Sequence, residues 1–337
     1  MKTKMSIPQK IWAYIKGNPI VVMMTLVSLI VGCTIKNFFS LNNFNVLMGN
    51  TTIRFLIALG VSGCLITKGT DLSAGRQAAL AATLTGVMVQ RADYASRLFT
   101  WMPEMNMWIV LLIVLVIGAM IGLISGSIVA YLKVPPFIAT LGIQTIVYGI
   151  NLIYTGAQPI GGFHQNFKDF FNWRVLSVGN FKGFSGYILF AVLFGLLFYF
   201  LYNKTTHGKY MYAIGGNENA AEVSGVNVKK KLVQIYMIAG AMYAFAGFLM
   251  TGKSGGASAS MGVGYELEAI AGCTIGGVST TGGIGTVPGI LVGVLVFELL
   301  KIILQFLRVD PNFNYIVQGL VVITAVAMDI RKYVAKK

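Results

Sequence analysis

Long apolar segments without charged residues recur along the whole chain. Residues 107–130, for example, contain no Asp, Glu, Lys or Arg. A run of about 20 apolar residues lets a helix cross the hydrocarbon core of a bilayer. Hydrophobic residues make up 56% of the sequence and charged residues 11%, against roughly a quarter charged in a soluble domain. The sequence therefore predicts an all-α, polytopic integral membrane protein and excludes soluble and disordered chains.

The apolar segments predict about ten transmembrane helices. They cover residues 19–38, 50–67, 72–90, 107–130, 136–155, 185–203, 232–251, 266–280, 284–307 and 314–330. The segment 266–280 is short and rich in glycine, which indicates a broken or re-entrant segment. We expect one transmembrane domain over 19–330, with a cytoplasmic N-terminal segment, 1–18, and a cytoplasmic tail, 331–337.

The placement of Lys and Arg predicts the orientation. With both termini in the cytoplasm, about 16 of them fall in inner segments and about 8 in outer ones. This asymmetry favours an N-in/C-in arrangement. It also explains the net charge of +15 by cytoplasmic flanks that face anionic lipid, so no nucleic-acid partner is expected.

Small residues recur every four positions, which puts them on one face of a helix. Such ridges let backbones approach closely in lipid. Close helix packing is the simpler interpretation, and surfaces that slide during a conformational change are the alternative. The ridges are Ala78, Ala82 and Gly86; Gly118, Gly122 and Gly126; Gly272 and Gly276; and Gly285, Gly289 and Gly293.

Two groups of polar residues interrupt the apolar sequence. In GTDLSAGRQ, residues 69–77, Asp71 or Ser73 is expected to cap the next helix, tied to Lys68 or Arg76. Alternatively this turn, with Gln77, lines a substrate path. In the span 136–155, one face carries Thr140, Gln144, Tyr148 and Asn151. These side chains suit either hydrogen bonds between helices or a path for a neutral polyhydroxylated solute.

Other charged residues within spans receive a structural interpretation. Glu298 and Lys301 lie three residues apart, so they are expected to pair. Lys301 and Arg54 sit toward the outer ends of their spans, where their side chains can snorkel. The few buried acids do not form a series that resembles a proton relay.

The largest predicted cytoplasmic loop, 204–231, is too small to bind and hydrolyse a nucleotide by itself. Gly215 and Gly216 permit a sharp turn, Asn217 can cap a short helix that extends to Val223, and Gly225 can end it. So short a helix is unstable alone. It is either part of an ordinary loop or an element that docks into a groove of a soluble partner.

Four motifs carry a resemblance to a known family. They are GTDLSAGRQ at 69–77, PPFIATLG at 135–142, YAIGGNENAAEVSGVNV at 212–228 and YELEAIAGCTIGGVSTTGGIGTVPG at 265–289. Together they resemble the permease subunits of carbohydrate ABC importers of the ribose, galactose and xylose group, in the family's order and over nearly the whole chain. IVYGIN at 146–151 and the tail VDPNFNYIVQG…DIRKYVAKK are most similar to the branch that imports galactose and methyl galactosides. Close relatives carry ribose, xylose or nucleosides.

The resemblance implies a vitamin-importer-like permease fold in the cytoplasmic membrane of a bacterium. It implies three protein partners: a second permease subunit, which is usually identical in this group, a tandem ABC ATPase, and an extracytoplasmic sugar-binding protein. ATP and Mg²⁺ are then bound by the ATPase, and the permease carries no cofactor and no catalytic residue. The alternatives are an ion-coupled secondary transporter and a membrane scaffold without transport activity.

The resemblance also assigns roles to residues. The segment from Asn217 to Gly225 matches the family's coupling helix, which fits a cleft in the ATPase. The residues expected to couple to the ATPase are Gly215, Gly216, Asn217, Glu218, Ala221, Ser224 and Gly225. Those expected along the translocation pathway are Asp71, Ser73, Gln77, Thr140, Gln144, Tyr148 and Asn151. Glu266 and Glu268 are expected on the side of the binding protein.

Overall fold

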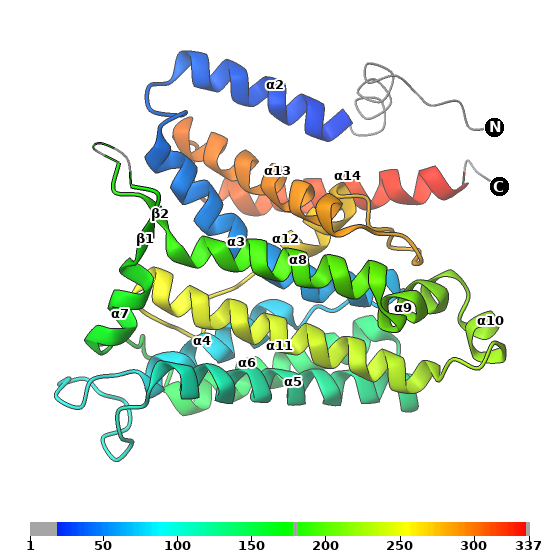
Figure 1. Cartoon of the computed structure of the whole chain (residues 1–337), viewed down its shortest axis with the longest axis horizontal. Coiled ribbons are helices and arrows are strands. Elements are labelled where there is room, and N and C mark those ends of the chain that lie inside the picture. The colour runs from blue at the N-terminus through cyan, green and yellow to red at the C-terminus, as the bar shows by residue number, and fades with distance from the viewer. Residues whose placement is uncertain (1–18, 178, 180, 335–337) are drawn as a thin grey trace.

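The computed structural model describes residues 19–177, 179 and 181–334, so the predicted segment 1–18 and the end of the predicted tail lie outside the described residues. The described residues are helical apart from one small hairpin and the connecting loops (Figure 1). Its elements are α2 (Pro19–Thr34), α3 (Leu41–Ile66), α4 (Ala74–Met88), α5 (Met107–Tyr131), α6 (Pro136–Thr155), α7 (Gln165–Asn172), β1 (Arg174–Val175), β2 (Phe184–Ser185), the 3₁₀ turn η1 (Gly186–Ile188), α8 (Leu189–Lys204), α9 (Thr206–Gly216), α10 (Glu218–Val223), α11 (Val228–Ser254), α12 (Tyr265–Ile275), α13 (Val287–Phe306) and α14 (Phe313–Val334).

Six of the described helical segments are long and apolar enough to cross a membrane. They are Leu41–Ile66, Met107–Tyr131, Pro136–Thr155, Gly186–Lys204, Val228–Ser254 and Val287–Phe306. Val22–Thr34 and Phe313–Asp329 are apolar but shorter. α4 has 15 residues and α12 has 11, which is about 22 Å and about 16 Å of helix. Neither helix alone spans a hydrocarbon core of roughly 30 Å.

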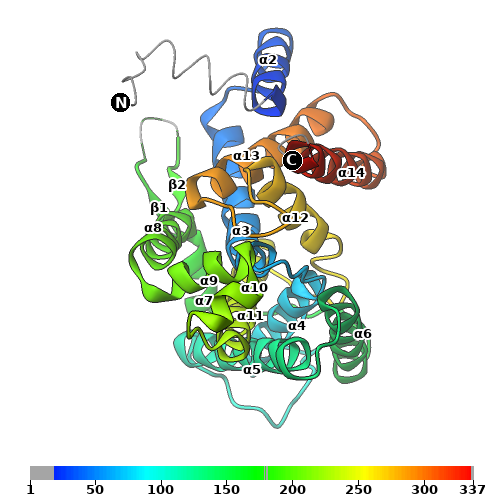
Figure 2. The same ribbon diagram turned by 90° about the vertical axis from the view of Figure 1, so that its right-hand side faces the viewer.

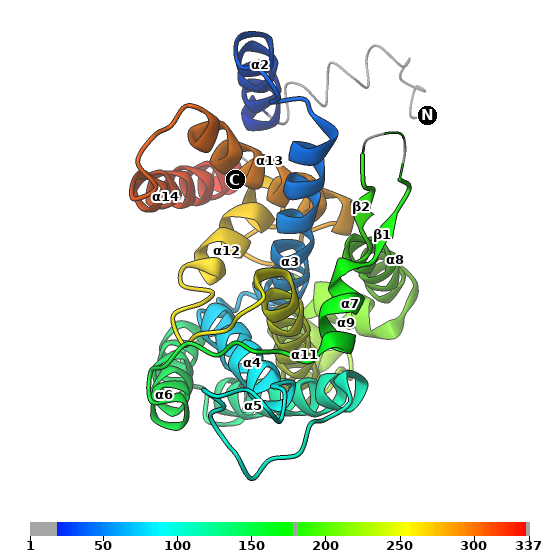
Figure 3. The ribbon, with the colours of Figure 1, turned by 90° about the vertical axis from the view of Figure 1, so that its left-hand side faces the viewer.

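The helices run along the long axis of the molecule, and the connections gather at its two ends (Figure 1). One end carries α7 and the hairpin, in which Arg174 pairs with Ser185 (Figure 3). We call this the α7 end. The opposite end carries α9 and α10 and is called the α10 end (Figure 2). α14 also runs toward the α10 end, and α2 runs in the opposite direction (Figure 1).

The core is built around α3 and α11. In their most apolar windows 89% and 72% of the residues are buried, whereas the figure is 22% for α5 and for Gly186–Lys204. The outer faces of those helices expose large apolar side chains, among them Leu112 on α5 and Leu196 on α8. A bilayer would cover these faces, so the distribution of exposed side chains supports a multi-pass membrane protein.

The small-residue ridges are packing surfaces. A Cβ atom at Gly118 would lie 2.4 Å from the carbonyl oxygen of Gly240, and one at Gly122 would lie 2.1 Å from that of Tyr236. The α5 and α11 backbones are therefore in contact there. Gly293 on α13 meets the carbonyl oxygen of Gly272 on α12 in the same way, at 1.9 Å. These contacts confirm the prediction of close helix packing.

Candidate functional site

Asp71 lies in the buried turn between α3 and α4 and is 1% exposed. Its Oδ1 accepts hydrogen bonds from the backbone N–H of Ser73 at 2.9 Å and from the Ser73 hydroxyl at 2.5 Å. Its Oδ2 accepts one from the Tyr243 hydroxyl at 3.1 Å. Gln77 donates to Ser73 Oγ at 2.7 Å. The carboxylate thus ties the turn to itself and to α11.

The prediction that Asp71 or Ser73 caps α4 is wrong. Ser73 occupies the N-cap position, but its backbone is already in the right-handed helical region and its side chain accepts no backbone N–H of the helix. The Asp71 oxygens are taken by Ser73 and Tyr243, so neither Lys68 nor Arg76 is its partner. The turn follows its own hydrogen bonds instead of the N-cap geometry.

The polar face of α6 lies against α4 and the turn before it. Thr140 Oγ1 donates to the Thr70 carbonyl and accepts from the Leu72 N–H, both at 3.1 Å. Asn151 Oδ1 accepts from the Thr83 hydroxyl at 2.7 Å. Five of the seven predicted pathway residues, Asp71, Ser73, Gln77, Thr140 and Asn151, are therefore buried. The structure favours hydrogen bonds within the protein for them.

Gln144 and Tyr148 differ from the other residues on this face because both are half-buried. The Arg76 guanidinium carbon lies 3.9 Å from the centre of the Tyr148 ring, a cation–π contact. Arg76 also donates to the Ala259 carbonyl at 3.2 Å. Gln144 has no hydrogen-bond partner among the described residues. These side chains bring polar groups to the surface along α4 and α6.

Glu266 stands at the first turn of α12, opposite the first turn of α4. It is 8% exposed, and its Oε2 atom has no hydrogen-bond partner among the described residues. A Cβ atom at Gly75 would lie 2.2 Å from that oxygen, so a glycine is needed at this contact. α4 and α12 lie between α6 on one flank and α14 on the other (Figures 2 and 3). An unpartnered carboxylate oxygen at this position is a candidate acceptor for a solute hydroxyl.

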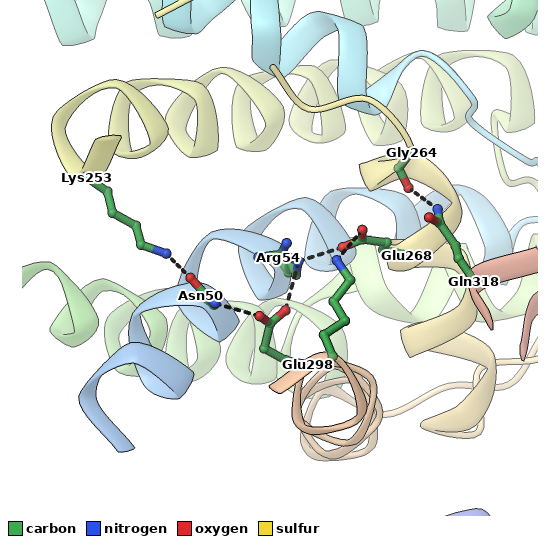
Figure 4. Close-up of polar contacts among 8 residues, drawn as sticks. Asn50, Arg54, Lys253, Gly264, Glu268, Glu298 and Gln318 are labelled. Atoms are coloured by element: carbon green, nitrogen blue, oxygen red, sulfur yellow. Dashed lines mark hydrogen bonds and ion pairs between the residues drawn. The ribbon is translucent and has the colours of Figure 1, made fainter. Parts of the chain in front are cut away.

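A cluster of charged side chains joins α3, α12 and α13 (Figure 4). Arg54 Nε lies 2.6 Å from Glu268 Oε2 and 2.9 Å from Glu298 Oε2. Lys301 Nζ lies 2.5 Å from Glu268 Oε1, and Asn50 donates to Glu298 Oε1 at 2.7 Å. All four charged side chains are at most 17% exposed.

This cluster corrects two predictions. Lys301 pairs with Glu268 on α12, and Glu298 pairs with Arg54 on α3, so the expected Glu298–Lys301 pair within α13 does not form. Arg54 and Lys301 are also buried in the protein and do not snorkel to the interface. Both Glu268 oxygens are occupied by cations of the same chain, which gives this residue a structural role. A role at the binding-protein side stays a prediction for Glu266 and Glu268.

The short helix predicted in the loop 204–231 is confirmed as α10. Asn217 caps it by accepting from the Ala220 N–H at 3.0 Å, and Gly225 follows its end with φ +86°. The Ser224 hydroxyl donates to the Ala220 carbonyl at 2.7 Å. Glu218 lies 3.4 Å from Lys133 in the turn between α5 and α6.

The two sides of α10 differ in a way that its sequence did not reveal. Ala221 is 5% exposed and packs with Ile214, Val226 and Leu232. Val223, in contrast, is 90% exposed. Ala221 therefore holds α10 on the chain, and Val223 is the large apolar residue that α10 presents outward.

The joint between α9 and α10 is packed against two other segments. A Cβ atom at Gly215 would lie 1.8 Å from the carbonyl oxygen of Ile66, at the end of α3, and 2.5 Å from the Gly283 nitrogen. Gly283 N–H donates to that same Ile66 carbonyl at 2.8 Å. Tyr212 donates to the Gly285 carbonyl at 2.8 Å. These contacts connect the end of α9, directly before α10, with the end of α3 and with the segment that leads into α13.

The end of α11 contains GFLMTGKS, residues 247–254, which matches the P-loop pattern GxxxxGK[ST]. The pattern needs a loop whose free N–H groups surround a phosphate. Here the segment is the last part of a continuous helix, and Gly247 packs against the carbonyl oxygen of Ala78. Its backbone donors are used within the helix, so the match is one of letters only. The described residues also contain no group of three His, Cys, Asp or Glu side chains placed to bind a metal.

Comparison with known proteins identifies the family of the chain. Residues 43–326 match the family described as branched-chain amino acid transport system / permease component. The chain is 45% identical over 326 residues to the galactose/methyl galactoside import permease protein MglC of Haemophilus influenzae, with 96% of each chain covered. It is 45% identical over 328 residues to MglC of Escherichia coli, covering 96% of this chain and 97% of the relative.

A ribose permease is a more distant relative. The ribose import permease protein RbsC of Haemophilus influenzae is 34% identical over 319 residues, covering 92% of this chain and 90% of the relative. No solved structure matches the chain. The family match covers most of the chain, including α9, α10, the turn 69–77 and the polar face of α6. This multi-pass membrane protein therefore belongs to the permease components of the branched-chain amino acid transport system family.

Proposed function

We propose that this chain is the membrane permease subunit of an ATP-driven, binding-protein-dependent importer of galactose and methyl galactosides. The observation that carries the proposal is the 45% identity to two galactose/methyl galactoside permeases along almost the entire length of both chains. The ribose relative at 34% identity makes ribose the second candidate sugar.

Ten membrane crossings are proposed on the path of the chain. α11 ends at the α7 end, where Ala257 bonds with Ile160, and Gly283 reaches the α10 end. Residues 255–286 therefore run the full length of the molecule, with α12 as their helical part. The turn 67–73 and α4 return from the α10 end in the same manner. Added to α2, α3, α5, α6, α8, α11, α13 and α14, these two segments give an even number of crossings and an N-in/C-in topology.

The partners are assigned to the two ends. The α10 end is cytoplasmic in this proposal, so α10 and Val223 dock on a tandem ABC ATPase, which binds ATP and Mg²⁺. The α7 end receives the sugar-binding protein. The permease pairs with a second copy in the cytoplasmic membrane of a bacterium and has no catalytic residue.

The sugar path is proposed along α4, α6 and α12. Arg76, Gln144 and Tyr148 are half-buried polar side chains on otherwise apolar helices, and exposure of such groups to lipid is costly. Water between two copies would remove that cost. Glu266 Oε2 adds a free acceptor near the same surface. So few polar groups suit a path that releases its cargo quickly, while affinity resides in the binding protein.

The experiment that tests the function measures uptake of radiolabelled methyl galactoside and of ribose in cells that express this chain with its ATPase and binding protein. Deletion of the permease is expected to abolish methyl galactoside uptake and leave ribose uptake unchanged. Loss of ribose uptake without loss of methyl galactoside uptake would identify ribose as the imported sugar. Uphill accumulation by vesicles that contain this chain alone would contradict ATP-driven import.

A further inference from the structure

A cavity of about 220 Å³ lies at the α10 end. It opens to the surface and is lined by the turn after α3, the turn between α5 and α6, and the starts of α10 and α11. Lys68, Lys133, Glu218 and Tyr236 supply its polar side chains, and Pro135 and Leu232 are among the apolar ones. The proposed sugar path uses none of these residues.

The hydroxyl of Tyr236 makes this cavity unusual. Tyr236 is 1% exposed, and its hydroxyl oxygen has no hydrogen-bond partner among the described residues. The hydroxyl lies against Gly69, another residue of the cavity wall, because a Cβ atom there would be 2.5 Å from it. Buried hydroxyls in folded proteins almost always have a partner. Tyr236 lines the cavity, so a ligand that reaches this oxygen would supply one.

Two lysine side chains line the same cavity, and their ammonium groups make only long polar contacts. Lys68 Nζ is 3.4 Å from the Gly216 carbonyl oxygen, and Lys133 Nζ is 3.4 Å from Glu218 Oε1. The Lys133 and Glu218 side chains are 62% and 46% exposed, so their ion pair adds little stability. A stronger acceptor can therefore replace Glu218 at low cost.

The backbone is left-handed at both lysines. Lys68 has φ +65° and Lys133 has φ +56°, the left-handed region that Gly and Asn adopt more readily. A glycine would form either turn with less strain.

We propose that this cavity binds a phosphate group, held by Lys68, Lys133 and the Tyr236 hydroxyl. Ammonium and phenol donors are a suitable set for a phosphate monoanion or diester. The phosphate comes either from an anionic phospholipid of the adjoining leaflet or from free phosphate. Tyr131 and Leu132, which precede Lys133, are 58% and 70% exposed and offer an apolar surface for acyl chains.

Occupancy has a consequence for α10. A phosphate on Lys133 replaces Glu218 and releases the ion pair between α10 and the α5–α6 turn. Only this consequence rests on the proposed function, because α10 is proposed there as the ATPase contact. Phosphate binding itself is independent of transport.

The test measures ligand binding to the full-length chain. Affinities are measured on the chain in nanodiscs, and retained ligands are identified by native mass spectrometry. The probes are phosphatidylglycerol, phosphatidylcholine and inorganic phosphate. The variants are Lys68→Gln/Lys133→Gln and Tyr236→Phe. Lys209→Gln is the matched control, because Lys209 is exposed on α9 at the same end. The double variant is expected to lose about tenfold or more in affinity, Tyr236→Phe several-fold, and the control less than twofold.

The outcomes separate the two sources. If the wild-type chain retains phosphatidylglycerol selectively and the double variant does not, the phosphate belongs to a lipid headgroup. If the wild-type chain shows no lipid preference but binds inorganic phosphate, and the double variant loses that binding, the ligand is free phosphate. Absence of binding, or equal losses in the double variant and Lys209→Gln, overturns the proposal. If the double variant does not fold, unchanged binding by Tyr236→Phe and by Lys68→Gln alone overturns it as well.

Discussion

The Tyr243 hydroxyl on α11 donates to Asp71 Oδ2, 172 residues earlier in the chain, at 3.1 Å. Together with Ser73 this bond fixes the turn that leads into α4. Asp71→Ala removes the acceptor of three hydrogen-bond donors, two of them on Ser73, and is expected to lower the free energy of unfolding by about 2–4 kcal/mol. Tyr243→Phe removes one donor and is expected to cost about 1 kcal/mol. Thermal unfolding in detergent measures both.

Uptake of the same variants separates the two interpretations of Asp71. We expect Asp71→Asn and Asp71→Ala to reduce transport, because a loosened turn displaces the start of α4. Normal uptake together with lowered thermal stability would confine Asp71 to a purely structural role.

The sequence was most informative where the signal is local. Asn217 and Gly225 bracket α10 because an N-cap and a left-handed residue act on their own neighbours. Apolar length and small-residue spacing likewise predicted long helices and their close contacts. Both signals are properties of a single segment, so no knowledge of the tertiary fold was needed.

Long-range partners were not predictable in this way. Spacing on α13 paired Lys301 with Glu298, yet the rotation of α13 against α3 and α12 gives each residue a partner on another helix. Asp71 looked like a helix cap because its bond to Tyr243 crosses the fold. The same limit applies to α10, where packing on α11 decides that Ala221 faces inward and Val223 outward.

Val223 is expected to be the apolar anchor of α10 in the ATPase cleft. Val223→Asp puts a charge on a residue that is 90% exposed, so the permease should fold normally. Burial of that carboxylate in a cleft should weaken ATPase binding at least about tenfold, measured by co-purification of the ATPase. Trp101→Asp, an exposed residue in the loop before α5, is the control and should retain the ATPase. Full retention by Val223→Asp would contradict the role of α10.

Ala221 predicts a different outcome at the same helix. Ala221→Leu inserts bulk between α10 and α11, where Ala221 is 5% exposed, and is expected to displace α10 from the chain. ATP hydrolysis should then proceed without uptake. The permease as a whole should remain folded, because Ala221 belongs to the small cluster around Leu232 and not to the main core. Coupled uptake in Ala221→Leu at the wild-type ratio to hydrolysis would contradict this.

The charge cluster predicts non-additive stability effects. Glu268→Gln leaves Arg54 and Lys301 beside a single acid and is expected to cost about 3–5 kcal/mol of unfolding free energy. Lys301→Gln in the same chain removes one excess charge and should recover part of that loss. A double-mutant cycle from thermal unfolding measures the coupling. Additive effects would show that Glu268 and Lys301 do not interact.

The polar face of α6 separates into a structural and a transport part. Asn151→Leu removes the acceptor of the Thr83 hydroxyl and is expected to lower stability by about 1–3 kcal/mol. Gln144→Leu breaks no bond among the described residues, so its stability should be unchanged while the rate of methyl galactoside uptake falls. The contrast between the two variants identifies the path, because only Gln144 is half-exposed. Wild-type uptake kinetics in Gln144→Leu would remove α6 from the proposed path, and a large stability loss in that variant would mean that Gln144 packs against the protein.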